Sequence, residues 1–208
     1  LLAAQFAWMF ASCAPSDPVD PCATYPSAPA GSAHPLFVAM DCLVQTPDGS
    51  RDNPFQRISD AIAAATPDTV ILIASGVYEE NLKIDKKQPL ALIGASDLSR
   101  PVEGGVVIRS PGNDSAIFII GPGGGVPDKV ALRGIRVESP STAGIWAHQA
   151  VVEVEACSIT GPKKVEGQYG FGVLATGGSV LSMRNSEVSD AALLGVHLSA
   201  SSATIEGC

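Results

Sequence analysis

A short repeat in the second half of the chain constrains its fold most, because short repeated strands bury their apolar faces only by stacking. Three six-residue segments align, and in each an apolar residue is followed five places on by Val or Ile. They begin at Leu132, Val154 and Met183, and a truncated fourth begins at Ile205, so the starts are 22, 29 and 22 residues apart. A period near 22 residues leaves no room for a strand–helix–strand unit. We therefore expect a solenoid of stacked strands.

A second set of segments keeps the same phase. Gly144, Gly172 and Gly195 each open an apolar segment and follow the first set by 12, 18 and 12 residues. The longer middle distance places an insertion around residues 162–168, and residues 90–94 and 116–119 are a looser earlier copy. The constant phase predicts an all-β, right-handed parallel β-helix with about 22 residues per coil. An antiparallel sandwich is the alternative, but it needs no constant phase.

Alternation along each strand assigns the side chains to two faces. The aligned residues expected in the interior are Ile117, Ile145, Val173 and Val196, with Ile119, Ala147, Ala175 and Leu198. The residues expected to face outward are Phe118, Trp146, Leu174 and His197, beside Ile120, His148, Thr176 and Ser199. These outward columns contain no Asp, Glu, Lys or Arg. We take Phe118, Trp146, His148 and His197 as candidate ligand-binding residues, because their rings could stack on sugars. Alternatively, an insertion, a loop or further chain covers this face.

A short helix is expected to close the N-terminal end of the solenoid. Asn53 suits the N-cap, Pro54 the first helical position, and Gln56 has the spacing of a capping box. An apolar stripe follows at Phe55, Ile58, Ile62 and Ala65, which predicts a capping helix over about residues 54–66. The acidic spacing just upstream, in residues 48–53, is interpreted as a turn into this cap rather than a calcium loop. We expect no metal site and no cofactor.

The N-terminal residues have the pattern of an export signal. Residues 1–12 are apolar but too short to span a bilayer. Phe10-Ala11-Ser12-Cys13 resembles a bacterial lipobox, with Phe where Leu is usual, and this resemblance implies lipidation of Cys13. A buried helix ending at Ser12 is the alternative. Three regions follow from this interpretation: residues 1–13 are the signal and lipobox-like segment, residues 14–35 are a Pro/Ala/Ser-rich tether, and residues 36–208 are the β-helix.

Charge and cysteine positions limit the partners and the compartment. The net charge of −8 argues against nucleic acid, since phosphate binding needs clustered Lys and Arg. Cys22 and Cys42 could pair in an oxidising compartment, or both could be free. Cys157 and Cys208 share a register with Ser186 between them, about 9.6 Å apart by strand spacing, which is too far for a disulfide. Because the chain starts without Met and stops inside a repeat, we expect it to be truncated at both ends.

The chain resembles a known superfamily in the order of its first elements. A helix, the run VILIA, the string SGVYEENLKI and then LALIG resemble the opening of pectin-lyase-like β-helices. More narrowly, DGSRDNPFQRISDAI followed by SGVYEENLKI resembles DUF1565-type proteins of bacterial surfaces, and the likeness covers residues 37–208. That superfamily includes lyases, hydrolases, esterases and non-catalytic proteins, so the resemblance implies the fold and leaves the activity open.

The esterase-like motifs are incomplete. Gly76, Tyr78 and Glu80 match the G-x-Y-x-E string of pectin methylesterases, and residues 149–151 match their Q-A-V segment. The family's Asp-containing strand should follow, but residues 171–174 read FGVL, without Asp. We expect Glu79 and Glu80 on a solvated turn and Lys83 on an outer face. The catalytic residues are unknown.

Two hypotheses follow. The first is an exported protein of the bacterial outer membrane or cell surface, or else a secreted one, anchored through Cys13 and acting as a non-catalytic scaffold or carbohydrate-binding module. Its partners would be a polysaccharide and the membrane. The second is a polysaccharide lyase or carbohydrate esterase whose catalytic residues lie outside this fragment.

Overall fold

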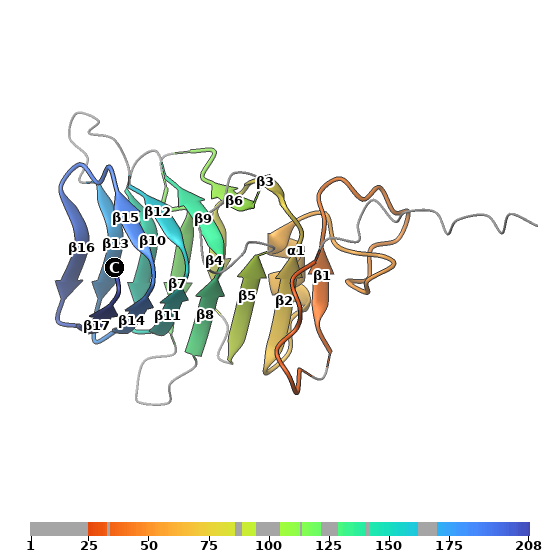
Figure 1. The fold of residues 1–208 in the computed structure, drawn as a ribbon, viewed down its shortest axis with the longest axis horizontal. Helices are drawn as coiled ribbons and strands as arrows, with labels where there is room; N and C mark the ends of the chain where they lie inside the picture. Colours follow the sequence, from red (N-terminus) through yellow and green to blue (C-terminus); the bar gives the residue numbers. More distant parts are fainter. Residues whose placement is uncertain are drawn as a thin grey trace, which may run out of the picture.

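Three parallel sheets wind along the chain as a solenoid (Figure 1). The structure is a computed structural model that describes residues 25–32, 34–85, 89–94, 105–112, 114–121, 129–139, 142–161 and 170–208. Sheet A consists of β1 (Leu36–Val38), β2 (Thr69–Ile73), β5 (Leu90–Gly94), β8 (Lys129–Arg133), β11 (Val151–Glu155), β14 (Val180–Arg184) and β17 (Ser202–Glu206). Sheet B consists of β3 (Gly76–Glu79), β6 (Val106–Arg109), β9 (Ile135–Glu138), β12 (Ser158–Thr160) and β15 (Glu187–Ser189). Sheet C consists of β4 (Leu82–Ile84), β7 (Ile117–Ile120), β10 (Ala143–His148), β13 (Phe171–Thr176) and β16 (Leu194–Ser199).

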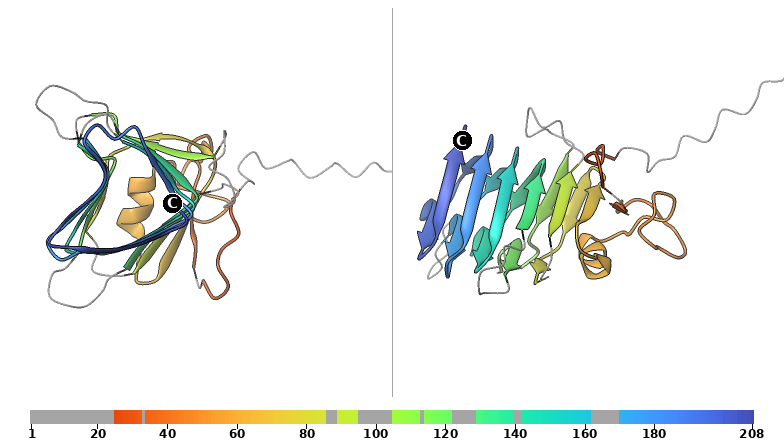
Figure 2. Two further views of the ribbon diagram at one scale, coloured as in Figure 1. Left: turned by 60° about the vertical axis from the view of Figure 1, so that its left-hand side comes forward. Right: turned by 90° about the horizontal axis from the view of Figure 1, so that it is seen from below.

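Each coil contributes one strand to each sheet. From β2 onward the chain passes from sheet A to B to C and back, and each strand pairs in parallel with its equivalent in the next coil. Viewed along the axis, the coils enclose a three-sided outline, and from the side the strands lie one beside another (Figure 2). The chain is therefore a parallel β-helix, as its repeat predicts.

The strand register confirms the predicted alignment. In sheet A, Leu132 pairs with Val154, and Val154 pairs with Met183. These side chains, together with Ile145 and Val173 of sheet C, are buried and belong to one continuous core. Burial on this scale stabilises a fold by about 25 cal/mol per Å² of apolar surface removed from water.

The predicted interior positions become exposed in the last coil. Leu198 is 38% exposed and Ile205 is 48% exposed, although their equivalents Ala175 and Met183 are fully buried. The reason is that no described strand stacks on the outer edge of β16 or β17. The inward-facing side chains of these edge strands are therefore partly open to solvent.

Left-handed turn residues connect sheet A to sheet B. Gly134, Ala156, Asn185 and Gly207 occupy the same place in successive coils, with φ of 60°, 50°, 48° and 62°. The sequence alignment predicts Asn185 as a turn residue in this column, which the structure confirms. A non-glycine residue in this region costs roughly 1–2 kcal/mol, so the recurrence shows that the coil path requires this conformation.

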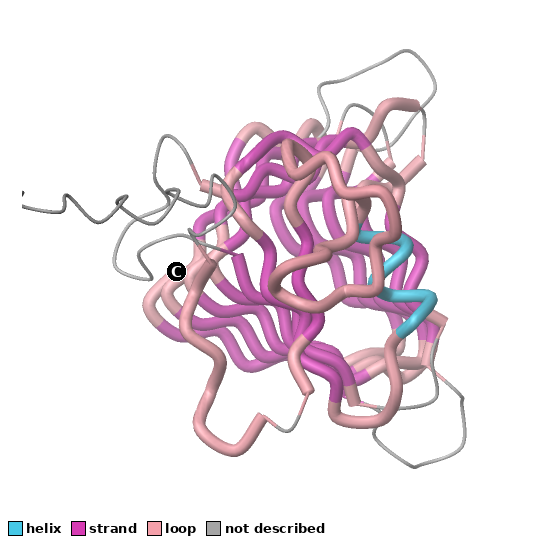
Figure 3. The backbone as a smooth tube through the Cα atoms, turned by 90° about the vertical axis from the view of Figure 1, so that its right-hand side faces the viewer, coloured by secondary structure: helices cyan, strands magenta, loops and turns pink. Residues whose placement is uncertain are grey.

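The capping helix begins later than predicted. Helix α1 covers Ile58–Ala64 and buries Ile58, Ala61 and Ile62. It lies at the N-terminal end of the stack (Figure 3), inside the outline of the coils in the axial view (Figure 2). The predicted caps are wrong, because the N-cap is Arg57 and no side-chain cap bond comes from it. Phe55 precedes the helix and forms a parallel bridge with Val38.

Glu80 supplies the missing cap from across the coil. Its Oε1 accepts a hydrogen bond from the Ile58 N–H at 2.8 Å, and its Oε2 accepts one from the Ser59 N–H at 3.1 Å. The Ser59 hydroxyl donates to the same Oε2, and the Arg57 guanidinium lies 3.6 Å from it. Glu80 is 6% exposed, so the expectation of a solvated turn is wrong for this residue. Its neighbour Glu79 is exposed, as expected.

The other two residues of the G-x-Y-x-E string are also structural. The Tyr78 hydroxyl donates to the Ala74 carbonyl at 2.9 Å, and burial raises the pKa of this phenol above its usual range. A side chain at Gly76 would place its Cβ 2.9 Å from the Met40 sulfur. Glu80 therefore holds the helix to the first coil, while Tyr78 and Gly76 pack within that coil against Ala74 and Met40.

The described cysteines include two free thiols and one residue in a disulfide. Cys157 and Cys208 are free, and Glu155, Arg184 and Glu206, each two residues before a member of the predicted column, pair across successive strands, which agrees with the predicted register. Burial raises the pKa of Cys157 to about 11, so this thiol is inert at neutral pH. Cys42 is in a disulfide, so the alternative that it is free is wrong. Its partner lies outside the described residues, where the sequence has Cys13 and Cys22.

Candidate functional site

The outward face of sheet C brings the predicted ligand-binding residues together. Register pairs Phe118 with Trp146, Trp146 with Leu174, and Leu174 with His197, as predicted. Strand β4 adds Lys83, which pairs with Phe118 at the start of the column. The residues predicted for the outward columns include no Asp, Glu, Lys or Arg, and Lys83, which was predicted on an outer face, extends the first column by one charged residue.

Aromatic rings on this face form two separate pairs. The Phe118 and Trp146 ring centroids are 4.7 Å apart with planes tilted by 35°. The rings of Phe171 and His197 stack at 5.1 Å. Leu174, which is 9% exposed, occupies the position between Trp146 and His197 in the column. The sequence predicts one continuous column, whereas the structure has two aromatic pairs.

A single hydroxyl fixes the Trp146 ring. The indole Nε1–H donates to Thr176 Oγ1 at 3.2 Å, and His148 Nδ1 lies 2.9 Å from the same oxygen. Thr176 Oγ1 in turn lies 3.4 Å from the Ala147 carbonyl. Because the indole is held at its N–H edge and packs against Phe118, its orientation is set before any ligand arrives.

A hollow of about 390 Å³ opens beside the Phe118–Trp146 pair. The residues that line it are Asn81, Leu82, Lys83, Asp114, Ser115, Phe118, Thr142 and Trp146. Ser115 is 6% exposed, and its hydroxyl has no hydrogen-bond partner. The Lys83 ammonium forms an ion pair with Asp85 at 3.2 Å. The hollow thus combines an aromatic wall, polar groups of both charges and an unsatisfied buried hydroxyl.

Of the polar residues that line this hollow, only Lys83 was predicted to face outward. Asn81, Lys83 and Asp114 come from the starts of β4 and β7, where loops of different length break the repeat that reveals the later coils. Asn81 is anchored by the Ser110 hydroxyl, which donates to its Oδ1 at 2.6 Å. The alternation of Leu82, Lys83 and Ile84 was the available signal, and it correctly places Lys83 outward.

Two arrangements that glycan-cleaving enzymes use, a carboxylate pair facing this hollow and a metal site, are not found among the described residues. Hydrolysis of a glycoside by the usual route needs two carboxylates facing one site, and among the described residues that line the hollow only Asp114 is acidic. The described part of the chain contains no group of three or more His, Cys, Asp or Glu that could hold a metal ion. The Asp48 carboxylate closes a local turn by accepting the Ser50 N–H at 2.8 Å, a contact that lowers its pKa.

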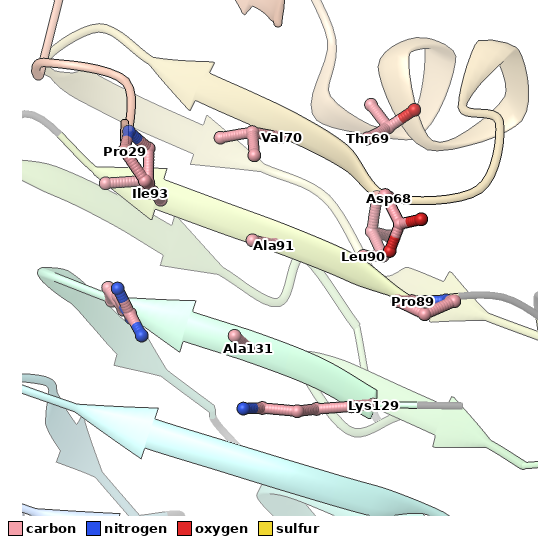
Figure 4. A pocket seen from close by; sticks show the side chains of 11 residues that line it. Pro29, Asp68, Thr69, Val70, Pro89, Leu90, Ala91, Ile93, Lys129 and Ala131 are labelled. Atoms are coloured by element: carbon pink, nitrogen blue, oxygen red, sulfur yellow. The ribbon is translucent and has the colours of Figure 1, made fainter. Parts of the chain in front are cut away.

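A second hollow, of about 260 Å³, lies on the outer face of sheet A (Figure 4). Its floor is apolar and includes Val70, Ala91 and Ala131. The cations at its edge are already paired, Lys129 with Glu153 at 2.5 Å and Arg133 with Glu155 at 3.1 Å.

Other predicted features lie outside the described residues. These are the lipidation site Cys13, the export segment and the insertion at residues 162–168. Within the part of the chain that is described, no helix has the length and apolar character needed to cross a bilayer.

The fold and site define a parallel β-helix protein with an aromatic and polar hollow on one sheet. The chain belongs to the family described as "Protein of unknown function (DUF1565)", whose model matches residues 44–205. A comparison with curated proteins finds no match.

Two solved structures of a pectin methylesterase from Aspergillus niger are similar in fold. They are a penultimately deglycosylated form, at 20% identity, and a deglycosylated form, at 19% identity, each with a TM-score of 0.55. The match covers 86% of this chain and 58% of the esterase chain. At this identity the likeness shows the shared β-helix alone.

Proposed function

We propose that this chain is a non-catalytic β-helix scaffold that binds a carbohydrate at the outer face of sheet C. The observation that carries the proposal is the half-exposed Phe118–Trp146 pair beside the polar hollow. Aromatic faces attract the C–H groups of sugar rings, while a few fixed polar groups select among hydroxyls. Lys83 and Asp114 supply a donor and an acceptor at the hollow, and Ser115 supplies a hydroxyl.

Preorganisation supports this proposal. Thr176 holds the Trp146 indole, and Phe118 packs against it, so ordering the rings on binding costs little entropy. The Phe171–His197 pair lies two strands further along the same sheet, about 10 Å away by strand spacing. An extended chain of several sugars could therefore contact both pairs.

The binding test is a glycan array on the complete protein, followed by titration of any hit. Trp146→Ala should weaken binding by about 5-fold to 150-fold, because one aromatic contact of this kind contributes on the order of 1–3 kcal/mol. Trp146→Phe keeps a ring and should retain part of the affinity. Val77→Ala, an exposed apolar position on sheet B, is the matched control and should bind as the parent does. Absence of glycan binding by the parent, or release of methanol from methyl-esterified pectin, would contradict the proposal.

We also propose that the protein is exported and anchored to a bacterial membrane through Cys13. The Cys42 disulfide supports export, because such bonds persist in oxidising compartments. The lipobox-like segment before Cys13 supports lipidation. Metabolic labelling with palmitate in a bacterial host should mark the parent and not Cys13→Ala. Cys208→Ala, which removes an exposed free thiol, should label normally. Equal labelling of the parent and Cys13→Ala would overturn the anchor.

A further inference from the structure

We infer that His148 is held as its Nδ1–H tautomer and presents Nε2 outward, as a hydrogen-bond acceptor for a ligand hydroxyl beside Trp146. The identity of the ligand as a saccharide rests on the proposed function, whereas the tautomer does not. The consequence is that a ligand hydroxyl can donate a hydrogen bond to His148 Nε2.

Counting donors and acceptors around Thr176 gives the tautomer. A threonine hydroxyl has one proton to donate and two lone pairs to accept with. Trp146 Nε1–H can only donate, so it occupies one lone pair. When the hydroxyl proton is directed to the Ala147 carbonyl, the second lone pair is free for His148, and all three contacts are satisfied only if Nδ1 carries a proton.

The opposite tautomer satisfies fewer of these contacts. If Nδ1 were bare, the Thr176 proton would have to point to it, and the Ala147 contact at 3.4 Å would lose its donor. The hydroxyl would then make two hydrogen bonds instead of three. Because partners fix which imidazole nitrogen carries the proton, the geometry favours Nδ1–H and leaves the Nε2 lone pair for a ligand.

The neighbours of His148 bring no described charge to it. Across the sheet it pairs with Ile120 of β7 and Thr176 of β13, and Trp146 lies two residues before it on its own strand. Gly177 lies against the ring, since a Cβ there would be 2.8 Å from His148 Cε1. The imidazole therefore lies against uncharged groups among the described residues.

The acceptor at Nε2 adds one hydrogen bond to a ligand hydroxyl. His148→Phe keeps a ring at this position but removes both nitrogens. Affinity for a saccharide should therefore fall by about fivefold, because one neutral hydrogen bond contributes about 1 kcal/mol.

The tautomer is tested first, without ligand, by long-range ¹H–¹⁵N correlation NMR of the complete protein near pH 8. We expect the His148 pattern of an Nδ1-protonated ring. Thr176→Val, which removes the acceptor, should lose that preference, whereas Thr160→Val, an outward threonine on sheet B, should leave it unchanged. An Nε2-protonated ring in the parent would overturn the assignment.

Binding is then measured for the parent, His148→Phe and Thr160→Val, with the best neutral oligosaccharide from the glycan array. Thr160→Val should bind as the parent does, and His148→Phe should bind about fivefold more weakly. Equal binding by His148→Phe and the parent would overturn the role of His148 and leave the proposed function standing. A chain that binds no saccharide would overturn the proposed function and with it the ligand assigned here.

Discussion

Replacing Glu80 with Ala should destabilise the protein by about 3 kcal/mol, since the carboxylate is buried and accepts hydrogen bonds from two helix N–H groups and a hydroxyl. The substitution leaves the Ile58 and Ser59 amides without partners at the start of α1. For a chain of this length the midpoint of thermal unfolding should fall by roughly 6–12 °C. Circular dichroism during a thermal or urea titration measures the effect.

Glu79 provides the matched control. It is the adjacent residue with the same side chain, but it is exposed and lies 3.7 Å from Arg109 at the surface. Glu79→Ala should change the free energy of unfolding by no more than about 0.5 kcal/mol. Equal losses for the two variants would show that Glu80 does not act as the cap of α1. Glu80→Gln retains one acceptor oxygen and should fall between the parent and Glu80→Ala.

The second large effect is expected at Gly172, at the start of β13. A Cβ there would lie 2.2 Å from Val188 Cγ1 and 2.6 Å from the Gly195 carbonyl oxygen. The side chain could move, but the backbone oxygen belongs to the next coil and is held by sheet pairing. Gly172→Ala should therefore destabilise the protein by about 3 kcal/mol, at the upper end of the usual cost of overpacking. Urea unfolding followed by tryptophan fluorescence would measure it.

Gly195 occupies the same position one coil later and serves as the control. Its Cβ would meet Val188 Cγ1 at 3.7 Å, which is an ordinary contact. Gly195→Ala should change stability by less than about 1 kcal/mol. Adding Val188→Ala to Gly172→Ala should recover part of the loss, since it removes one of the two clashes. Similar losses at Gly172 and Gly195 would contradict this packing argument.

The strand register was predictable because the repeat is a local property of the sequence. Leu132, Val154 and Met183 align by spacing alone, and the structure pairs them in that register. Alternation then identifies the interior columns, since successive side chains in a strand face opposite sides. Asn185 and its equivalents follow from the same alignment, and all of them have positive φ.

The start of the helix was not predictable in this way. Asn53 and Gln56 have the types and spacing of a capping box, but the chain before Ile58 is held by other contacts. Phe55 bridges to Val38, and Gln56 donates to the Cys42 carbonyl at 3.1 Å. The cap instead comes from Glu80, 22 residues further along the chain. A capping rule based on neighbouring residues cannot identify a capping side chain this far along the chain.

The candidate site was likewise predictable where it depends on local alternation and not where it depends on distant contacts. Outward positions for Phe118, Trp146 and His148 follow from alternation, and the structure confirms their pairing. The hollow itself depends on Lys83 and Asp114, which reach it from coils whose loops break the repeat. The pairing of His197 with Phe171 depends on how two side chains lean across neighbouring strands.

The sequence by itself determined that short strands stack in parallel coils with a fixed register and an apolar interior, because period and alternation act between near neighbours. Only the tertiary structure decided that Glu80 caps the helix, that the outward rings form two pairs, and that Thr176 holds Trp146 and His148 together. These contacts join residues on different strands, so they depend on the path of the turns between them. That path is set by packing of the whole coil.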